Sequence, residues 1–182
     1  ILARDMHLPK QDIHTLGMAA LFHDIGKEQL PGRILLKTDP LTSAEAKIYQ
    51  QHCLWGVDAG KAAGLPAAVL RIISQHHEMC NGSGYPKHLK MAEIDPLARI
   101  LSLVNCYDNY CNRLNPADSL TPHEDLSLMF SQQKAWFDPI PLNLMIHSMG
   151  FYPPGSLVML SNDCFALVMA VNSAKPLKPV VL

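Results

Sequence analysis

Apolar residues recur at helical spacing along the first two-thirds of the chain. In residues 11–25 they fall at near-helical intervals, and Gly26 follows as a helix stop. After Pro66, which suits a first helical turn, one apolar stripe is expected to be buried and to end in a histidine. Its members lie at positions i, i+3, i+4 and i+7: Val69, Ile72, Ile73 and His76. The pattern predicts a mainly α protein.

Capping signals predict where further helices begin. Thr42-Ser43-Ala44-Glu45 is a capping box, and the helix after it is expected to reach about Gly64 with His52 in its middle. Thr121-Pro122-His123-Glu124 is a second capping box with proline at the first helical position, and its helix is expected to reach about Phe137. A short helix is expected after Pro141, ending at Gly150.

One more helix is predicted from Pro96 to about Asn112. Its inward face is expected to consist of Leu97, Ile100, Leu101 and Val104. The preceding residues 81–86, with two glycines and a proline, cannot continue a helix and predict a shaped loop.

The pattern changes near the C-terminus. Residues 156–160 and 164–171 are β-prone, a turn separates them, and residues 180–182 predict a third short strand. The chain is therefore expected to consist of a helical domain, residues 1–151, and a small β appendage, residues 152–182.

Composition excludes several classes of function. Of 182 residues, 48% are hydrophobic, and 15 basic residues face 16 acidic ones, so a basic surface for a nucleic-acid polymer is not expected. No apolar run is long enough to predict a membrane-spanning segment. The five cysteines form no C-x-x-C pair, which favours a reducing, cytoplasmic compartment. Because the chain begins with Ile1, an N-terminal part of the protein is expected to be missing.

Two doublets, His23-Asp24 and His76-His77, are the candidates for chemistry. Neighbouring residues on a helix diverge by about 100°, so a doublet of ligating residues rarely serves one structural purpose. A carboxylate can bridge two cations, and imidazoles suit zinc, iron, manganese or nickel. His52, between the doublets, would bring a third helix to the same point. The structural alternative is a set of hydrogen-bonded core histidines, which is the usual role of a lone histidine on an apolar face.

These residues belong to a longer set of motifs. The run His23-Asp24-Ile25-Gly26-Lys27 matches the HD signature of metal-dependent phosphohydrolases. The extended signature is matched by His76-His77-Glu78, Asn81-Gly82-Ser83-Gly84-Tyr85-Pro86, Ala98-Arg99-Ile100, Tyr107-Asp108 and Phe137-Asp138-Pro139. In order and spacing, residues 1–150 resemble the HD-GYP domain, a family of bacterial cyclic-di-GMP phosphodiesterases. The resemblance implies an HD-type helical bundle, here with a small C-terminal β-hairpin appendage.

The resemblance also implies roles for individual residues. Two divalent metal ions, of iron, manganese or a similar metal, would be held by His23, Asp24, His52, His76, His77 and Asn105. Asp24 would bridge the ions, and Lys27 would neutralise the scissile phosphate, so these two are the expected catalytic residues. The expected substrate-binding residues are Gly82, Gly84, Tyr85 and Pro86. The implied reaction hydrolyses cyclic-di-GMP to pGpG or GMP in bacterial signalling, with signalling-protein partners.

Two departures from the family pattern leave alternatives open. Asn105 stands where the family has an aspartate ligand, and the 22 residues before His23 are too few to contain the histidine that the family places further upstream. The alternative is a catalytically impaired domain that binds a nucleotide or a protein partner and acts as a regulatory module. A third interpretation keeps the hydrolase and changes the substrate to another nucleotide.

Overall fold

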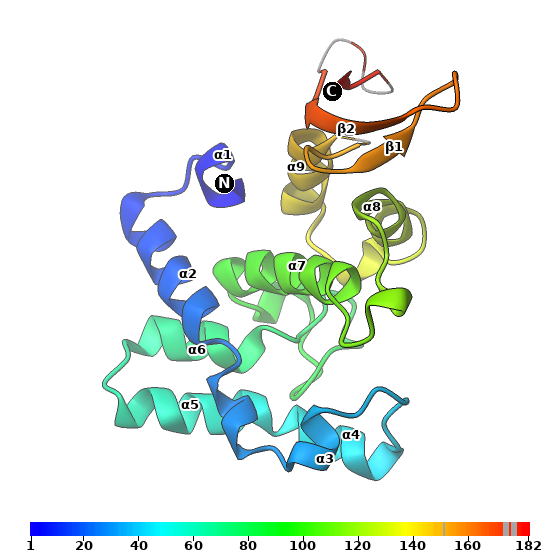
Figure 1. Cartoon of the computed structure of the whole chain (residues 1–182). Helices are drawn as coiled ribbons and strands as arrows, with labels where there is room; N and C mark the ends of the chain where they lie inside the picture. The colour runs from blue at the N-terminus through cyan, green and yellow to red at the C-terminus, as the bar shows by residue number, and fades with distance from the viewer. Residues whose placement is uncertain (151, 173–174, 176–177) are drawn as a thin grey trace.

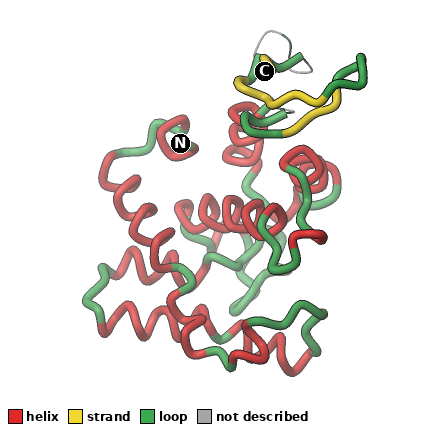
Figure 2. The backbone as a smooth tube through the Cα atoms, viewed as in Figure 1, coloured by secondary structure: helices red, strands yellow, loops and turns green. Residues whose placement is uncertain are grey.

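The computed structural model describes residues 1–150, 152–172, 175 and 178–182. Most of the described chain is helical (Figure 2). The α-helices are α1 (Leu2–Asp5), α2 (Lys10–Phe22), α3 (Gly32–Leu35), α4 (Ser43–Gln50), α5 (His52–Ala62), α6 (Ala67–Gln75), α7 (Pro96–Cys111), α8 (Pro122–Ser131) and α9 (Pro139–Met149). The 3₁₀ turns are η1 (Ile25–Gln29), η2 (Met91–Glu93), η3 (Pro116–Asp118) and η4 (Lys134–Trp136).

The central layer is made by α2, α5, α6 and α7. Helices α5 and α6 lie side by side, and α2 and α7 both contact α6 (Figure 1). The apolar stripe of α6 predicted from the sequence is confirmed, because Val69, Ile72 and Ile73 are fully buried in the core that these helices share. His76 follows the stripe as the C-terminal cap of α6 and is also fully buried.

A second core lies against α7, with α8 and α9 around it. Leu103, Met129 and Phe137 are among its buried members. The Arg99 guanidinium donates to Asp138 Oδ2 at 2.6 Å, and Asp138 caps the first turn of α9. This largely buried ion pair fixes α9 against α7 and links two of the family's motif segments.

The C-terminal segment forms a three-stranded antiparallel sheet of order β1-β2-β3. Its strands are β1 (Leu157–Met159), β2 (Phe165–Ala170) and β3 (Val180–Val181). The sheet lies beyond the end of α9 (Figure 1). Helix α9 stops at Gly150, where φ is +69° and a Cβ would meet the Val171 side chain. The prediction of a mainly α fold with a small β appendage is confirmed, and the third strand is present.

Some sequence predictions about helix ends were wrong. Helix α2 ends at Phe22, so Gly26 is not its stop but lies in the η1 turn. Gln51 interrupts the helix predicted after the first capping box, which makes His52 the first residue of α5. Helix α8 ends at Ser131, short of Phe137.

One core assignment on α7 was also wrong. Val104 is 39% exposed, whereas its neighbour Leu103 is fully buried. Helix α7 contacts α2, α6, α8 and α9, so its buried surface is set by several neighbours and is wider than one stripe. Among the described residues, none of the helices combines the length and the hydropathy that a membrane-spanning segment needs.

Candidate metal centre and its cavity

Four side chains from three segments meet at one point. Asp24 precedes η1, His52 begins α5, and His76 and His77 follow α6. One ligand atom from each of the four lies within 4.8 Å of those of the other three. The structure therefore brings together four of the six residues expected to bind metal.

The orientation of the histidine rings is fixed by main-chain carbonyls. Nδ1 of His52 lies 2.5 Å from Tyr49 O, and Nδ1 of His76 lies 2.6 Å from Ile73 O. A carbonyl oxygen only accepts, so each Nδ1 carries the proton and each Nε2 presents a lone pair. His23 repeats the arrangement, with Nδ1 2.8 Å from Ala20 O. Such a hydrogen bond to the outer ring nitrogen is typical of metal-ligating histidines.

The inner atoms of the cluster face one another as acceptors. The two Nε2 atoms of His52 and His76 are 3.3 Å apart, and they lie 3.5 and 3.6 Å from Asp24 Oδ1. Asp24 Oδ1 and His77 Nε2 are buried without a hydrogen-bond partner among the described residues. Unpaired acceptors in a buried site are costly. A divalent cation at their centre would satisfy all four, so the residues fit a metal ion.

The protonation states also suit a cation. Burial lowers the pKa of His52 to about 4 and lowers the pKa of His76 and His77 as well, so all three rings are neutral at pH 7. Burial opposes ionisation of Asp24, but the neighbouring His23 ring and the Lys27 ammonium, which donates to Asp24 Oδ2, outweigh it and lower the pKa of the carboxyl. Neutral imidazole and ionised carboxylate are the forms that bind metal.

Gly26 explains how Asp24 comes so close to His52. A Cβ on Gly26 would lie 2.0 Å from His52 O and 2.5 Å from Gly56 N, both main-chain atoms of α5. Only glycine permits this approach of η1 to α5. The glycine of the HD signature therefore sets the distance between two of the ligands.

The remaining predicted metal and catalytic residues lie beside the cluster. His23 Nε2 is 3.3 Å from Asp24 Oδ2, and Lys27 Nζ donates to the same oxygen at 2.6 Å. Asp24 thus has one oxygen engaged with His23 and Lys27 and the other turned toward the three-histidine side. Asn105 is buried on α7, where its Oδ1 accepts from Asn109 Nδ2 at 3.1 Å.

The glycine-rich loop, residues 81–86, contacts the histidine cluster through His77. A Cβ on Gly84 would lie 2.3 Å from Met79 N, and the loop turns back so that Tyr85 N donates to His77 O at 3.0 Å. The Tyr85 ring stacks on the His77 ring with 4.6 Å between centroids. None of the predicted loop residues Gly82, Gly84, Tyr85 and Pro86 lines the cavity described below.

Glu78 stabilises the segment after this loop through hydrogen bonds from main-chain amides to its carboxylate. It is 1% exposed, its Oε1 accepts from Lys87 N at 2.6 Å, and its Oε2 accepts from Leu89 N at 2.9 Å. The sequence places Glu78 in the motif but gives no sign of this role, because its partners are main-chain amides 9 and 11 residues later.

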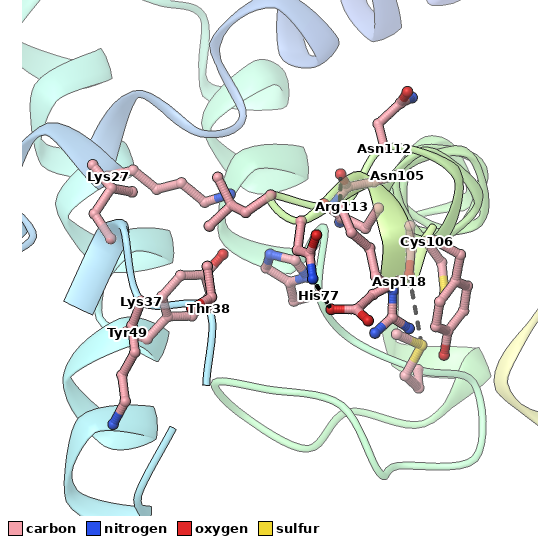
Figure 3. A pocket seen from close by; sticks show the side chains of 17 residues that line it. Lys27, Lys37, Thr38, Tyr49, His77, Asn105, Cys106, Asn112, Arg113 and Asp118 are labelled. Carbon is pink, nitrogen blue, oxygen red and sulfur yellow. Dashed lines mark hydrogen bonds between the residues drawn. The ribbon is translucent and has the colours of Figure 1, made fainter. Parts of the chain in front are cut away.

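A cavity of about 600 Å³ opens beside the cluster. His77, Asn105 and Lys27 line it, as do two cations that the sequence analysis did not single out as site residues, Lys37 and Arg113. Figure 3 shows Lys27, Lys37 and Tyr49 on one side and Asn105 and Arg113 on the other, with His77 between them. Lys37 also pairs with Glu45 at 2.6 Å. No local pattern marks these cations, because segments far apart in the chain build the cavity.

The fold, the histidine cluster and the motif spacing define an HD-type protein. The HD domain family matches residues 1–140, and the chain belongs to this family. Its relatives and a solved structure confirm the resemblance to HD-GYP proteins.

The relatives are all named as phosphodiesterases of cyclic dinucleotides. The chain is 30% identical over 184 residues to "Cyclic di-GMP phosphodiesterase PA4108" of Pseudomonas aeruginosa, covering 99% of this chain and 44% of the relative. It is 35% identical over 114 residues to "Cyclic di-GMP phosphodiesterase" of Thermotoga maritima, covering 62% of this chain and 31% of the relative. It is 27% identical over 147 residues to "3'3'-cGAMP-specific phosphodiesterase 2" of Vibrio cholerae, covering 80% of this chain and 28% of the relative. The chain thus spans less than half the length of these relatives.

A solved structure confirms the fold. The chain matches Bd1817, a "HDG"Y"P" protein from Bdellovibrio bacteriovorus, with a TM-score of 0.65 and 23% identity over 79% of this chain and 46% of that one.

Proposed function

We propose that this chain is a metal-dependent phosphodiesterase that hydrolyses a cyclic dinucleotide, with cyclic-di-GMP as the first candidate and pGpG or GMP as the product. One observation carries the proposal: four side chains able to bind a metal ion, two of them fully buried, converge beside a cavity lined by three cations. A cyclic dinucleotide carries two phosphodiester anions. The names of the relatives from Pseudomonas and Thermotoga support cyclic-di-GMP, and the Vibrio relative makes 3'3'-cGAMP the competing substrate.

The residues proposed to bind the first cation are Asp24, His52, His76 and His77. A second cation is proposed on the other side of Asp24, with His23 and the side-chain oxygen of Asn105 as its further ligands. Iron and manganese are the proposed metals, since imidazole and carboxylate ligands suit both. A cation held here supplies Lewis-acid activation of water and of the phosphodiester.

Lys27 has two proposed tasks. Its Nζ donates to Asp24 Oδ2 and lies 5.5 Å from the centroid of the Tyr49 ring, which keeps the carboxylate turned so that Oδ1 faces His52 and His76. Lys27 also lines the cavity, where its ammonium would stabilise the negative charge that builds up on the phosphoryl oxygens.

Substrate contact is proposed for the cavity wall. Lys37 and Arg113 would bind the second phosphate, and the Arg113 guanidinium is held 5.4 Å from the centroid of the Tyr110 ring. The residues Gly82, Gly84, Tyr85 and Pro86 are proposed to shape the site through His77, on which Tyr85 stacks.

All of these residues lie in 1–151, so we propose this range as the catalytic domain and 152–182 as a separate appendage.

The five cysteines are free thiols, which supports the proposal of a cytoplasmic protein. Signalling proteins are proposed as its partners, as the HD-GYP resemblance implies.

The test compares two histidine variants of the protein loaded with manganese or iron. His77→Ala is expected to lower both the bound metal, measured by elemental analysis, and the hydrolysis of cyclic-di-GMP by at least about tenfold. His14→Ala, an exposed histidine on α2, is the matched control and is expected to change neither. Turnover of 3'3'-cGAMP measured in parallel assigns the substrate. Metal content that His77→Ala leaves unchanged, or a metal-loaded protein that cleaves neither dinucleotide, would contradict the proposal.

A further inference from the structure

The C-terminal sheet has two apolar faces. On β2, Ala166 and Val168 are 5% and 1% exposed and point toward the protein, while the alternate residues point outward. The outward residues are all large and apolar, with exposures of 71% for Phe165, 42% for Leu167 and 53% for Met169. Antiparallel sheets that face water on one side usually alternate apolar with polar residues. This one does not.

The neighbouring strands extend the same face. Leu157 pairs with Leu167 and Met159 pairs with Phe165, and the two β1 residues are 70% and 66% exposed. On the other side of β2, Leu182 exchanges two main-chain hydrogen bonds with Leu167, at 2.9 and 3.0 Å, and is 85% exposed. We call this surface the outer sheet face; it consists of Leu157, Met159, Phe165, Leu167, Met169 and Leu182.

We propose that the outer sheet face is where two copies of this chain associate, sheet against sheet, about a two-fold axis. The pairing register makes the six residues neighbours, so they form one patch across β1, β2 and the residue that follows β3. At their exposures, six such side chains present on the order of 600 Å² per copy, so a symmetric pair buries on the order of 1,200 Å², the size of the smaller specific interfaces.

The chemistry of the face favours a second copy as the occupant. A two-fold contact places the same patch on both sides, so any charge on it would meet an identical charge or be buried unpaired. All six side chains of the outer sheet face are apolar, and the chain as a whole has a net charge of −1, which gives little repulsion between copies. Two such faces can pack like the halves of a β-sandwich, and methionine side chains adapt to small mismatches.

The experiment is sedimentation velocity on the chain from micromolar to near-millimolar concentration. The wild-type protein is expected to shift from its monomer mass of 20.1 kDa to twice that value as concentration rises. Leu157→Glu is expected to weaken the association at least about tenfold. Ile140→Glu is the matched control, since Ile140 is 69% exposed on α9, outside the outer sheet face, and this change should leave the association unchanged.

A second variant separates loss of the interface from loss of the strand. Leu182→Glu changes a side chain that is 85% exposed, so the glutamate does not disturb the packing between the sheet and the helices, and it is expected to weaken the association as well. Circular dichroism monitors folding of each variant. Wild-type protein that stays at 20.1 kDa at every concentration, or association that persists in both Leu157→Glu and Leu182→Glu, would overturn the proposal. The proposal would also be overturned if the protein stayed monomeric, bound phosphatidylglycerol vesicles and lost that binding in Leu182→Glu. That result would assign the outer sheet face to a lipid surface.

Discussion

The substitution Gly26→Ala tests how the metal centre is assembled. Its Cβ would lie 2.0 Å from His52 O, 2.5 Å from Gly56 N and 2.9 Å from His52 C. Real Cβ atoms almost never come within 3.0 Å of another heavy atom, and all three atoms are main chain, so no side-chain rotation relieves the contact. The η1 turn must move away from α5 by about 1 Å, and overpacking of this kind costs about 1–3 kcal/mol.

The same movement carries Asp24 away from the histidines. Asp24 precedes Gly26 by two residues, and its Oδ1 is 3.5 Å from His52 Nε2. A ligand displaced by about 1 Å is expected to weaken metal binding by about 10- to 100-fold, the range found for changes to groups that orient metal ligands. The substitution should therefore lower both the free energy of unfolding and the affinity for metal.

The assay pairs urea unfolding of the metal-free protein with manganese titration by calorimetry. Gly17→Ala is the matched control, because Gly17 lies on the exposed side of α2 and its Cβ would meet no atom within 4 Å. That change is expected to stabilise the protein by about 0.5–1 kcal/mol and to leave metal binding unchanged. If Gly26→Ala unfolds at the same urea concentration as Gly17→Ala and binds manganese as the wild type does, the close approach of η1 and α5 does not matter and the reasoning fails.

Three further predictions concern buried polar groups. Asp125 is fully buried, its Oδ1 has no partner among the described residues, and burial raises its pKa from 3.8 to about 6. The protonated form therefore stabilises the fold: its contribution is complete below pH 3.8, falls as pH rises from 3.8 to 6, and is lost above 6. The stability of Asp125→Asn relative to the wild type should therefore rise by up to about 3 kcal/mol between about pH 3 and pH 8 in urea unfolding, and a constant difference would contradict this. Glu78→Gln places an amide donor against one of two main-chain N–H groups and should lower the free energy of unfolding by about 1–3 kcal/mol. The control Glu93→Gln changes an exposed carboxylate that accepts from one amide and should cost less than half as much. Equal losses of stability in thermal unfolding would show that the loop does not depend on Glu78. Asn105→Asp adds a charged ligand beside the cavity and should raise metal occupancy and kcat more than it changes KM; a well-metallated wild type that the substitution slows would show that the asparagine is an adaptation.

Local structure and the residue types of the site could be predicted from the sequence. Both capping boxes form as the sequence predicts, with Thr42 accepting from Glu45 N and Thr121 from Glu124 N, because a cap depends on residues within one helical turn. The doublets His23-Asp24 and His76-His77 were visible as candidate ligands because they lie within recognisable local motifs. The β appendage was visible as well, since alternation and turn residues are local signals.

The distances within the site and the composition of the surfaces follow from the fold and could not be predicted from the sequence. The role of Gly26 depends on α5, which lies 26 residues further along at His52, so the sequence suggested a helix stop where the fold needs a missing side chain. Lys37 and Arg113 line the cavity because separate segments fold around one space, and the hydrophobic periodicity of the sequence does not predict which segments meet. Val104 was expected to be buried and is exposed, because burial on a helix with several neighbours depends on where those neighbours lie. Hydrogen bonds within a turn are set by adjacent residues, whereas close approach, cavity lining and burial are set by packing between segments that are distant in the chain.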